Sequence, residues 1–381
     1  MAALNRNIYR FSAPGRTEIG GNHTDHQRGC VLAAAVDLET TAEVTLNDSR
    51  VIRVFSDGYA PVEVSLDELE MRPEEQNTTA ALVRGIAAEF VRRGASVQGF
   101  DAQVHSTVLP GSGLSSSAAF EVLMGTILNH LFFDASLAPA EIARIGQYAE
   151  NVYFGKPCGL MDQMASAVGG MVMIDFAYPA CPVVERIDFD FAAAGHALCI
   201  IDTGADHAQL TGEYAAITEE LKQVCAFFGK EVLRQISQTE FYEALPRLRG
   251  NVADRAILRA MHVYAENERV EQQAQALRVG DFDAFLELVK ASGRSSWMYL
   301  QNITPAGAVE QQAVALTLAL CDTLLQGYGA YRVHGGGFAG TVQAFVPLEL
   351  LDTFRSGIEA VLGQGSCHVL SVRADGGKHV E

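Results

Sequence analysis

A glycine- and serine-rich loop, 110-PGSGLSSSAAFEV-122, separates a predicted strand from a predicted helix. The strand is the alternating run 100-FDAQVHSTVLP-110, and the helix is the apolar run 116-SSAAFEVLMGTILNHLF-132. Gly111 and Gly113 let the backbone approach a ligand closely, and the first N–H groups of a helix have no partner within it. Those N–H groups and the helix dipole favour an anion such as phosphate. Considered alone, a plain Gly/Ser turn with a serine N-cap explains the loop equally well.

The commonest nucleotide-binding loops do not fit this stretch. A Walker loop needs Gly-Lys followed by Ser or Thr, but the Gly-Lys pairs at 155, 229 and 377 are followed by Pro, Glu and His. A dinucleotide fingerprint needs a third glycine where this loop has serine, and the protein-kinase motifs are absent. The hydroxyls of Ser115, Ser116 and Ser117 can bind phosphate oxygens or a Mg²⁺ ion.

The charge balance limits the partners of the chain. It has 46 acidic against 28 basic residues, a formal net charge of −18, and we find no run of Lys or Arg. Nucleic acid is therefore excluded as a main partner. Any bound anion must be held by local positive groups, such as a helix N-terminus, a metal ion or a single arginine.

The length and the cysteines suggest a two-domain cytoplasmic protein. At 381 residues, with 49% hydrophobic residues, the chain is expected to form two domains. Its seven cysteines are scattered, odd in number and never in a C-x-x-C pair, which indicates a reducing compartment. No apolar run approaches the roughly 18 residues of a membrane span, and no signal peptide is visible. We expect a cytoplasmic monomer or weak homodimer without a membrane partner.

The order of the predicted elements favours an α+β architecture. Strand-like runs occupy the region up to about residue 75, and we expect four separate strands there: 7-NIYRFSAP-14, 30-CVLAAAVDL-38, 40-TTAEVTL-46 and 51-VIRVFSD-57. Helices follow at 77–94, 116–132 and 139–155. Strand patterns return at 170–200, where we place the boundary between domains 1–185 and 186–381. Helices from about 213 to 327, two strands, a helix and a last strand complete the second domain.

The stretch 15-GRTEIGGNHTDHQRG-29 crowds polar groups among glycines, as a binding site requires. His23, Asp25 and His26 are conceivable metal ligands, but their spacing is poor for a zinc site and no cysteine lies nearby.

A third stretch, 149-AENVYFGKPCGLMDQMAS-166, carries two carboxylates. Glu150 lies near the end of a predicted helix, and the following Pro-Cys-Gly turn presents Asp162. A carboxylate in such a place accepts a proton or orients a hydroxyl, and a second one holds a metal. Taken singly, each residue is better explained structurally, Glu150 as a solvated Glu and Asp162 as a helix-capping Asp. In the same way, 334-HGGGFAGTVQAF-345 either closes over a phosphate or forms a tight hairpin.

Taken in order, four motifs resemble those of the galactokinases, in the GHMP superfamily of small-molecule kinases. They are 14-PGRTEIGGNHTDH-26, 110-PGSGLSSSAAFEV-122, 156-KPCGLMDQMAS-166 and 334-HGGGFAGTVQAF-345. The run 206-DHAQLTGEYAA-216 is similar to the family's sugar-contacting segment. The resemblance spans Pro14 to about Phe345. It implies a two-domain GHMP kinase fold, with an N-terminal domain like ribosomal protein S5 domain 2 and a ferredoxin-like C-terminal domain.

The resemblance also implies a function, an ATP-dependent transfer of phosphate to the anomeric hydroxyl of galactose, with Mg²⁺ as cofactor. Asp162 is then the catalytic carboxylate, as a base or as an orienting group, and Arg16 keeps it ionised. Ser117 and Glu150 hold Mg²⁺. The sugar contacts are Asn22, His23, Thr24, Asp25 and Tyr214. The ATP contacts are Gly111, Ser112, Gly113, Leu114, Ser115, Ser116, Ser117, Gly335, Gly336 and Gly337.

Three departures bear on the substrate. The family motif reads Gly-Arg-x-Asn-x-Ile-Gly-Glu-His-x-Asp-Tyr, whereas this chain has Glu18 for the Asn, Asn22 for the Glu and His26 for the Tyr. The replaced Glu accepts a hydrogen bond from a sugar hydroxyl in the family, so Asn22 points to an altered preference. Alternatives are a kinase for another acceptor, such as an N-acetylhexosamine, another hexose or a non-sugar alcohol, and a non-catalytic sensor of galactose and ATP. The sensor is disfavoured because Asp162, Arg16 and the Ser-Ser-Ala run are all present.

Overall fold

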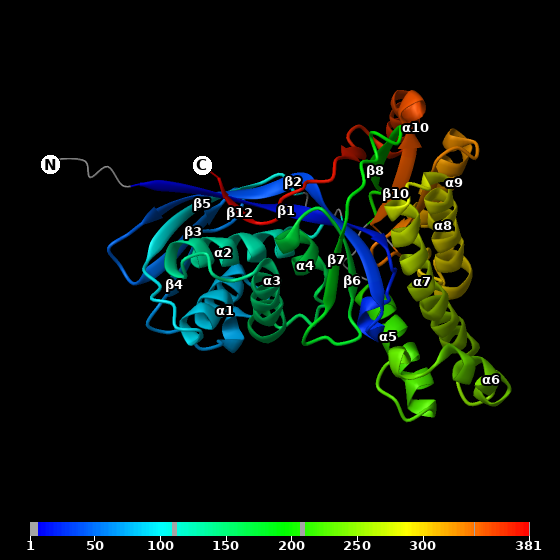
Figure 1. The fold of residues 1–381 in the computed structure, drawn as a ribbon, viewed down its shortest axis with the longest axis horizontal. Coiled ribbons are helices and arrows are strands. Elements are labelled where there is room, and N and C mark those ends of the chain that lie inside the picture. Colours follow the sequence, from blue (N-terminus) through cyan, green and yellow to red (C-terminus); the bar gives the residue numbers. More distant parts are fainter. Residues whose placement is uncertain (1–6, 109–112, 206–209, 339, 381) are drawn as a thin grey trace.

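The computed structural model describes residues 7–108, 113–205, 210–338 and 340–380. Two sheets stand at opposite ends of an elongated molecule, and each is covered by helices (Figure 1). Within the described ranges, none of the helices combines the length and the apolar composition that a bilayer crossing requires.

The first sheet has the strand order β12-β1-β2-β5-β3-β4, and β6 and β7 extend it from β2. Its strands are β1 (Ile8–Gly20), β2 (Cys30–Leu46), β3 (Val51–Ser56), β4 (Val62–Ser65), β5 (Phe100–Ser106), β6 (Met171–Asp175), β7 (Val183–Ile187) and β12 (Lys378–Val380). All pairs are antiparallel except β3 with β5.

Helices cover one face of this sheet (Figure 1). They are α1 (Thr79–Arg92), α2 (Ser116–Phe132), α3 (Pro139–Tyr148) and α4 (Met161–Val168), with the short 3-10 helix η2 (Pro73–Glu75) and a π-helical turn, η3 (Ala149–Phe154). The 3-10 helix η1 (Asp25–Gln27) follows β1 and instead contacts Leu233 through Gln27. Apolar residues of the sheet and of these helices form one continuous core. This core fixes the N-terminus of α2 and the first turn of α4 beside the end of β1.

The second sheet has the order β11-β8-β10-β9 and is antiparallel throughout. Its strands are β8 (His196–Asp202), β9 (Ala330–His334), β10 (Thr341–Pro347) and β11 (Cys367–Leu370). Helices lie between the first and second strands and between the third and fourth. This is the βαββαβ pattern of ferredoxin-like domains, as the family resemblance implies.

Helices pack on both faces of the second sheet. One face carries α9 (Ala313–Leu325) and α10 (Leu351–Leu362). The other carries part of a helical bundle made of α5 (Thr211–Phe227), η4 (Leu233–Gln235), α6 (Gln238–Leu248), α7 (Asp254–Arg278), α8 (Phe282–Ser295) and η5 (Ser296–Leu300), while η6 (Leu348–Leu350) precedes α10. Residues of β1, β2, α7, α8 and the second sheet share a core, so the two sheets are joined through a packed interface.

The expectation of four short strands in the first 75 residues was partly wrong. β1 continues through the polar run to Gly20, because residues 16–20 still pair with β2 across two register shifts. The two expected strands at 30–38 and 40–46 are a single strand, β2. The strand β7 spans the expected boundary at residue 185, and the last residues return to the first sheet as β12.

Candidate functional site

Arg16 and Asp162 form a bidentate salt bridge, although they are 146 positions apart in the sequence. Arg16 lies on β1, and Asp162 lies in the first turn of α4. The guanidinium donates from Nε to Oδ1 and from Nη2 to Oδ2, each at 2.7 Å. Burial raises the pKa of Asp162, but the charge and hydrogen bonds of Arg16, with a hydrogen bond from Ser115, lower it below its usual value. Asp162 is therefore ionised at neutral pH.

The start of α2 leaves its backbone N–H groups to a ligand. Ser115, the N-cap residue, adopts φ 57° and ψ 66° and makes no cap hydrogen bond. Its hydroxyl instead donates to Asp162 Oδ2 at 2.7 Å. Ser116 and Ser117 occupy the first turn and are half-buried. The arrangement combines an anion-binding helix start with the carboxylate of α4.

The described end of the glycine- and serine-rich loop before α2 lies against both β1 and the second domain. Arg16 N–H donates to Leu114 O at 3.0 Å, and Arg16 Nη1 donates to Gly113 O. Gly113 has φ 72°, and a Cβ there would meet Thr341 Oγ1 and the His334 ring. Only glycine therefore permits this approach. Gly111 and Ser112 lie outside the described residues.

Glu150 belongs to a buried cluster of polar side chains. It lies in η3, where Oε1 pairs with Lys156 Nζ at 3.1 Å and Oε2 accepts from Gln163 Nε2 at 2.9 Å. Gln163 Nε2 also donates to Glu121 Oε2 at 2.9 Å. Burial and the charge of Glu150 raise the pKa of Glu121 well above its usual value. Glu121 was missed by sequence reasoning, although it follows Ser117 by one helical turn of α2.

Three predicted binding residues hold the three successive carbonyls of 335–337. Asn22 Nδ2 donates to Gly335 O at 2.5 Å, and Tyr214 Oη donates to Gly337 O at 2.9 Å. His23 Nε2 lies 3.1 Å from Gly336 O, and burial lowers the pKa of His23 to about 4. The neutral ring thus donates through Nε2 and keeps Nδ1 as an acceptor.

The remaining residues of the loop after β1 differ in exposure. Thr24 is fully buried, and its hydroxyl lies 2.9 Å from Gly21 O and 2.5 Å from Cys30 O. Asp25 accepts from the backbone N–H of His26 at 2.8 Å. Its other oxygen lies against Gly159, where a Cβ would collide with it. The loop therefore brings Asp25 beside the turn that precedes Asp162.

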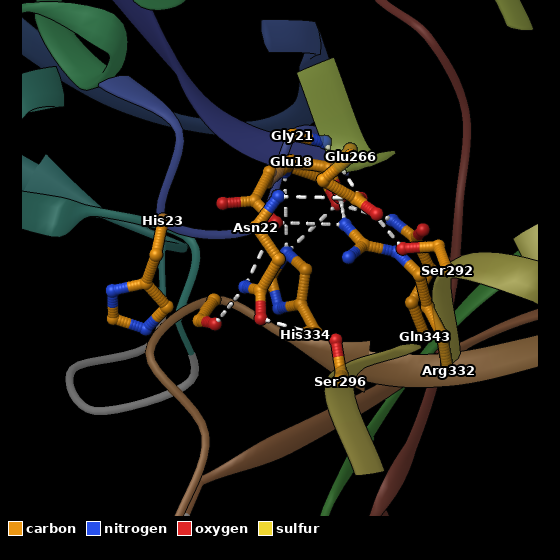
Figure 2. Close-up of polar contacts among 12 residues, drawn as sticks. Glu18, Gly21, Asn22, His23, Glu266, Ser292, Ser296, Arg332, His334 and Gln343 are labelled. Atoms are coloured by element: carbon orange, nitrogen blue, oxygen red, sulfur yellow. Dashed lines mark hydrogen bonds and ion pairs between the residues drawn. The ribbon is translucent and has the colours of Figure 1, made fainter. Parts of the chain in front are cut away.

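Behind this loop lies a buried polar network between the two domains, which the sequence did not predict (Figure 2). Arg332 Nη2 donates to Glu18 Oε1 and to Glu18 O, both at 2.8 Å. His334 accepts at Nε2 from the Glu18 N–H at 3.3 Å, so its Nδ1–H donates to Thr341 Oγ1 at 2.8 Å. Burial, Arg16 and Arg332 lower the pKa of His334 well below its usual value. The site is thus backed by neutral His334 and a buried ion pair.

Glu266 of α7 joins the same network from the bundle. Its Oε1 accepts from the backbone N–H groups of Gly21 at 3.2 Å and Asn22 at 3.4 Å, and from Ser292 Oγ at 2.6 Å. Burial raises the pKa of Glu266, but His262 and the arginines Arg269 and Arg332 lower it to about 2. The carboxylate therefore fixes the backbone that leads into His23.

The chain is similar to known proteins in both sequence and fold. Residues 81–170 match the family described as GHMP kinases N terminal domain, and residues 3–46 match the galactokinase galactose-binding signature. The chain is 32% identical to the galactokinase of Streptomyces coelicolor over 352 residues, covering 92% of this chain and 87% of that protein.

Solved structures show the same architecture. The crystal structure of Lactococcus lactis galactokinase complexed with galactose matches with a TM-score of 0.82 and 26% identity, covering 98% of this chain and 95% of that one. A mevalonate kinase structure matches with a TM-score of 0.69 and 13% identity, covering 96% and 99% of the two chains, and shares the fold.

Proposed function

The chain belongs to the galactokinase family, and from that premise we propose that it transfers the γ-phosphoryl group of ATP to the anomeric hydroxyl of galactose. The products are galactose 1-phosphate and ADP. One observation carries the proposal: Asp162 is held by both Arg16 and Ser115, the residue at the start of the phosphate-binding helix. This places an ionised carboxylate beside the phosphate site. The predicted two-domain GHMP kinase fold is confirmed by the structural matches.

In the proposed reaction, Asp162 accepts the hydrogen bond of the anomeric hydroxyl and aims that oxygen at the γ-phosphorus. The O–P bond to the sugar forms while the bond to the β-phosphate oxygen breaks, and the hydroxyl proton passes to Asp162. Because Arg16 lowers the pKa of Asp162, the carboxylate is a weak base. It therefore acts mainly by orientation, and proton transfer comes late, as phosphoryl transfer allows.

The phosphates bind at the start of α2. The free N–H groups of the first turn and the hydroxyls of Ser116 and Ser117 surround the phosphate oxygens on one side. The backbone at 335–337 closes the site from the second domain. Arg16 stabilises the negative charge that develops on the transferring group.

Mg²⁺ fits the oxygen ligands of this site. Mg²⁺ prefers one or two carboxylates together with substrate phosphates, and Ser117 and Glu150 supply a hydroxyl and a buried carboxylate. Among the described residues no cluster of three or more His, Cys, Asp or Glu forms a metal cage, so the substrate phosphates complete the set. Exposed Lys156 donates to Glu150 Oε1 and Gln163 donates to Oε2, so each oxygen keeps one further acceptor position for the ion. When bound, the ion neutralises charge on the β- and γ-phosphates.

His23 and Asp25 contact the sugar in this proposal. Neutral His23 offers Nδ1 as an acceptor, and Asp25 accepts from hydroxyl groups beside Gly159. Thr24 and Tyr214 shape the pocket through the backbone carbonyls that they hold. We place the reaction in the cytoplasm, where ATP is available and where the seven free thiols remain reduced.

The test is an assay of ADP release with Mg-ATP and a panel of free sugars. We expect turnover with galactose and formation of galactose 1-phosphate. Turnover with an N-acetylhexosamine and not with galactose would show that the acceptor is the N-acetylhexosamine. Binding of galactose and ATP without ADP release would show a sensor rather than an enzyme.

A further inference from the structure

Two residues that depart from the family motif touch one another. Asn22 Nδ2 donates to Glu18 Oε1 at 3.2 Å, and both side chains are buried. The family motif has Asn at position 18 and Glu at position 22, so this chain carries the same two side chains in exchanged positions. Resting on the proposed function, we propose that Glu18 and Asn22 form a compensated pair in which Asn22 positions the sugar loop and does not contact the sugar.

Glu18 is the counter-ion of a guanidinium that has no access to water. Arg332 is 0% exposed and donates through Nη2 to the carboxylate and the carbonyl of Glu18. An arginine remains charged when buried, so removing its partner carboxylate is strongly destabilising. The nearby Glu266 does not replace it, because its oxygens already serve the loop backbone, Ser292 and Arg269.

The amide of Asn22 has no hydrogen-bonding position left for a substrate. Nδ2 donates to Glu18 and Gly335 O, and Oδ1 accepts from Asn302 Nδ2 at 2.9 Å and Ser296 Oγ at 3.3 Å. These contacts use both donors and both acceptor positions of the side chain. The residue is also 0% exposed. A carboxylate at position 22 would face the Glu18 carboxylate and the Gly335 carbonyl without a proton to donate.

The backbone of Asn22 is held as firmly as its side chain. The carbonyl accepts from His262 Nε2 at 3.0 Å, and the N–H donates to Glu266. The next residue, His23, adopts φ 62°, in the left-handed region that a non-glycine residue rarely occupies. Position 22 therefore fixes both His23 and the 335–337 backbone. A substitution at this position is expected to weaken substrate binding more than it slows the chemical step.

The test is a double-mutant cycle of Asn22→Glu, Glu18→Asn and the reciprocal double variant. Each single variant is expected to lower the melting temperature by about 5 °C or more and to raise the KM for galactose about tenfold or more, with a smaller change in kcat. The double variant is expected to lose less melting temperature than the two single variants combined, and its rise in KM should be about threefold or more below the product of the two single rises, because an amide at position 18 can donate to a carboxylate at position 22. It is not expected to return to the wild type, because Arg332 then lacks the Glu18 carboxylate and Gly335 O faces a carboxylate. Glu43→Gln, at an exposed pair on β2, is the matched control and should change neither quantity.

Two results would overturn the proposal. One is a double variant no better than the sum of the single variants in both quantities, which would show that the positions are uncoupled. The other is a lower KM for galactose in Asn22→Glu alone, which would show that residue 22 meets the sugar directly. If the single variants do not fold, a folded double variant supports the pair and an unfolded one contradicts it. The melting temperatures remain decisive even if the acceptor is another sugar, so failure of the proposed function is seen separately.

Discussion

Ser115 turns its hydroxyl towards Asp162 instead of capping the helix that it begins. The helix start is thereby left open to a ligand, while the Asp162 carboxylate gains a donor that lowers its pKa. One side chain thus links the proposed phosphate site to the proposed acceptor site.

Ser115→Ala should shift the pH profile of kcat. The hydroxyl helps to keep the pKa of Asp162 below its usual value, so its removal raises that pKa and moves the acid limb to higher pH. We expect kcat at neutral pH to fall about tenfold, since one donor near the reacting groups is lost. Rates of the variant, the wild type and the exposed control Ser356→Ala, measured from pH 8 down to the lowest pH at which each protein stays folded, check this. An unmoved acid limb would separate Ser115 from Asp162.

Asp162→Asn should abolish catalysis while ATP still binds. The amide keeps the size of the carboxylate but carries no charge and accepts no proton, so turnover should fall by about 10³ or more. Calorimetric titration should give an ATP affinity within about threefold of the wild type, because the N–H groups of α2 are unchanged. Asp352→Asn, at an exposed position of α10, is the control. Activity above a tenth of the wild type would contradict the assigned role.

Glu150→Gln should weaken Mg²⁺ binding. The change removes the buried carboxylate and retains the hydrogen-bonding shape, so the Mg²⁺ concentration for half-saturation should rise about tenfold or more. Mn²⁺ binding followed by electron paramagnetic resonance in the presence of ATP gives a measurement independent of turnover. Glu287→Gln on the exposed face of α8 should bind the ion like the wild type. Equal Mn²⁺ affinity in Glu150→Gln and the wild type would remove Glu150 from the metal site.

Glu266→Gln should destabilise the protein in a pH-dependent way. Because the folded-state pKa of about 2 lies below the ordinary 4.5, the carboxylate stabilises the fold above pH 4.5, and this contribution is lost as the pH falls towards 2. The difference corresponds to about 3 kcal/mol at neutral pH. Urea unfolding at pH 7, 4 and 3 should show that the difference in the free energy of unfolding between variant and wild type becomes smaller as the pH falls. Glu268→Gln is the exposed control. A gap that stays constant with pH would show that the charge of Glu266 is not what stabilises the loop.

The sequence was enough to predict that Arg16 lies beside Asp162, because both residues belong to motifs of the family that the chain resembles. The interdomain network was not. Glu18 and Arg332 are 314 positions apart, and each alone reads as an ordinary charged residue on a strand. Their pairing depends on how the two sheets pack, which no local pattern encodes.

The predicted boundaries of the strands were wrong for a different reason. Polar residues between 37 and 41 suggested a break, yet β2 continues because it pairs with β1 along both halves and with β6 and β5 in turn. Tertiary pairing thus overrides local composition. No strand was predicted at 378–380. This short run forms a strand only by pairing with β1, at the other end of the chain, and a local pattern does not show such a pairing.

That last pairing bears on how the protein is made. β12 closes the edge of β1, the strand that carries Arg16, through the contacts of Arg10, Phe11 and Ser12 with residues 378–380. Synthesis proceeds from the N-terminus at about 5–20 residues per second, so β1 emerges before the second domain and its edge partner emerges after it. The catalytic sheet therefore waits, with one edge open, until the ribosome has finished the entire second domain.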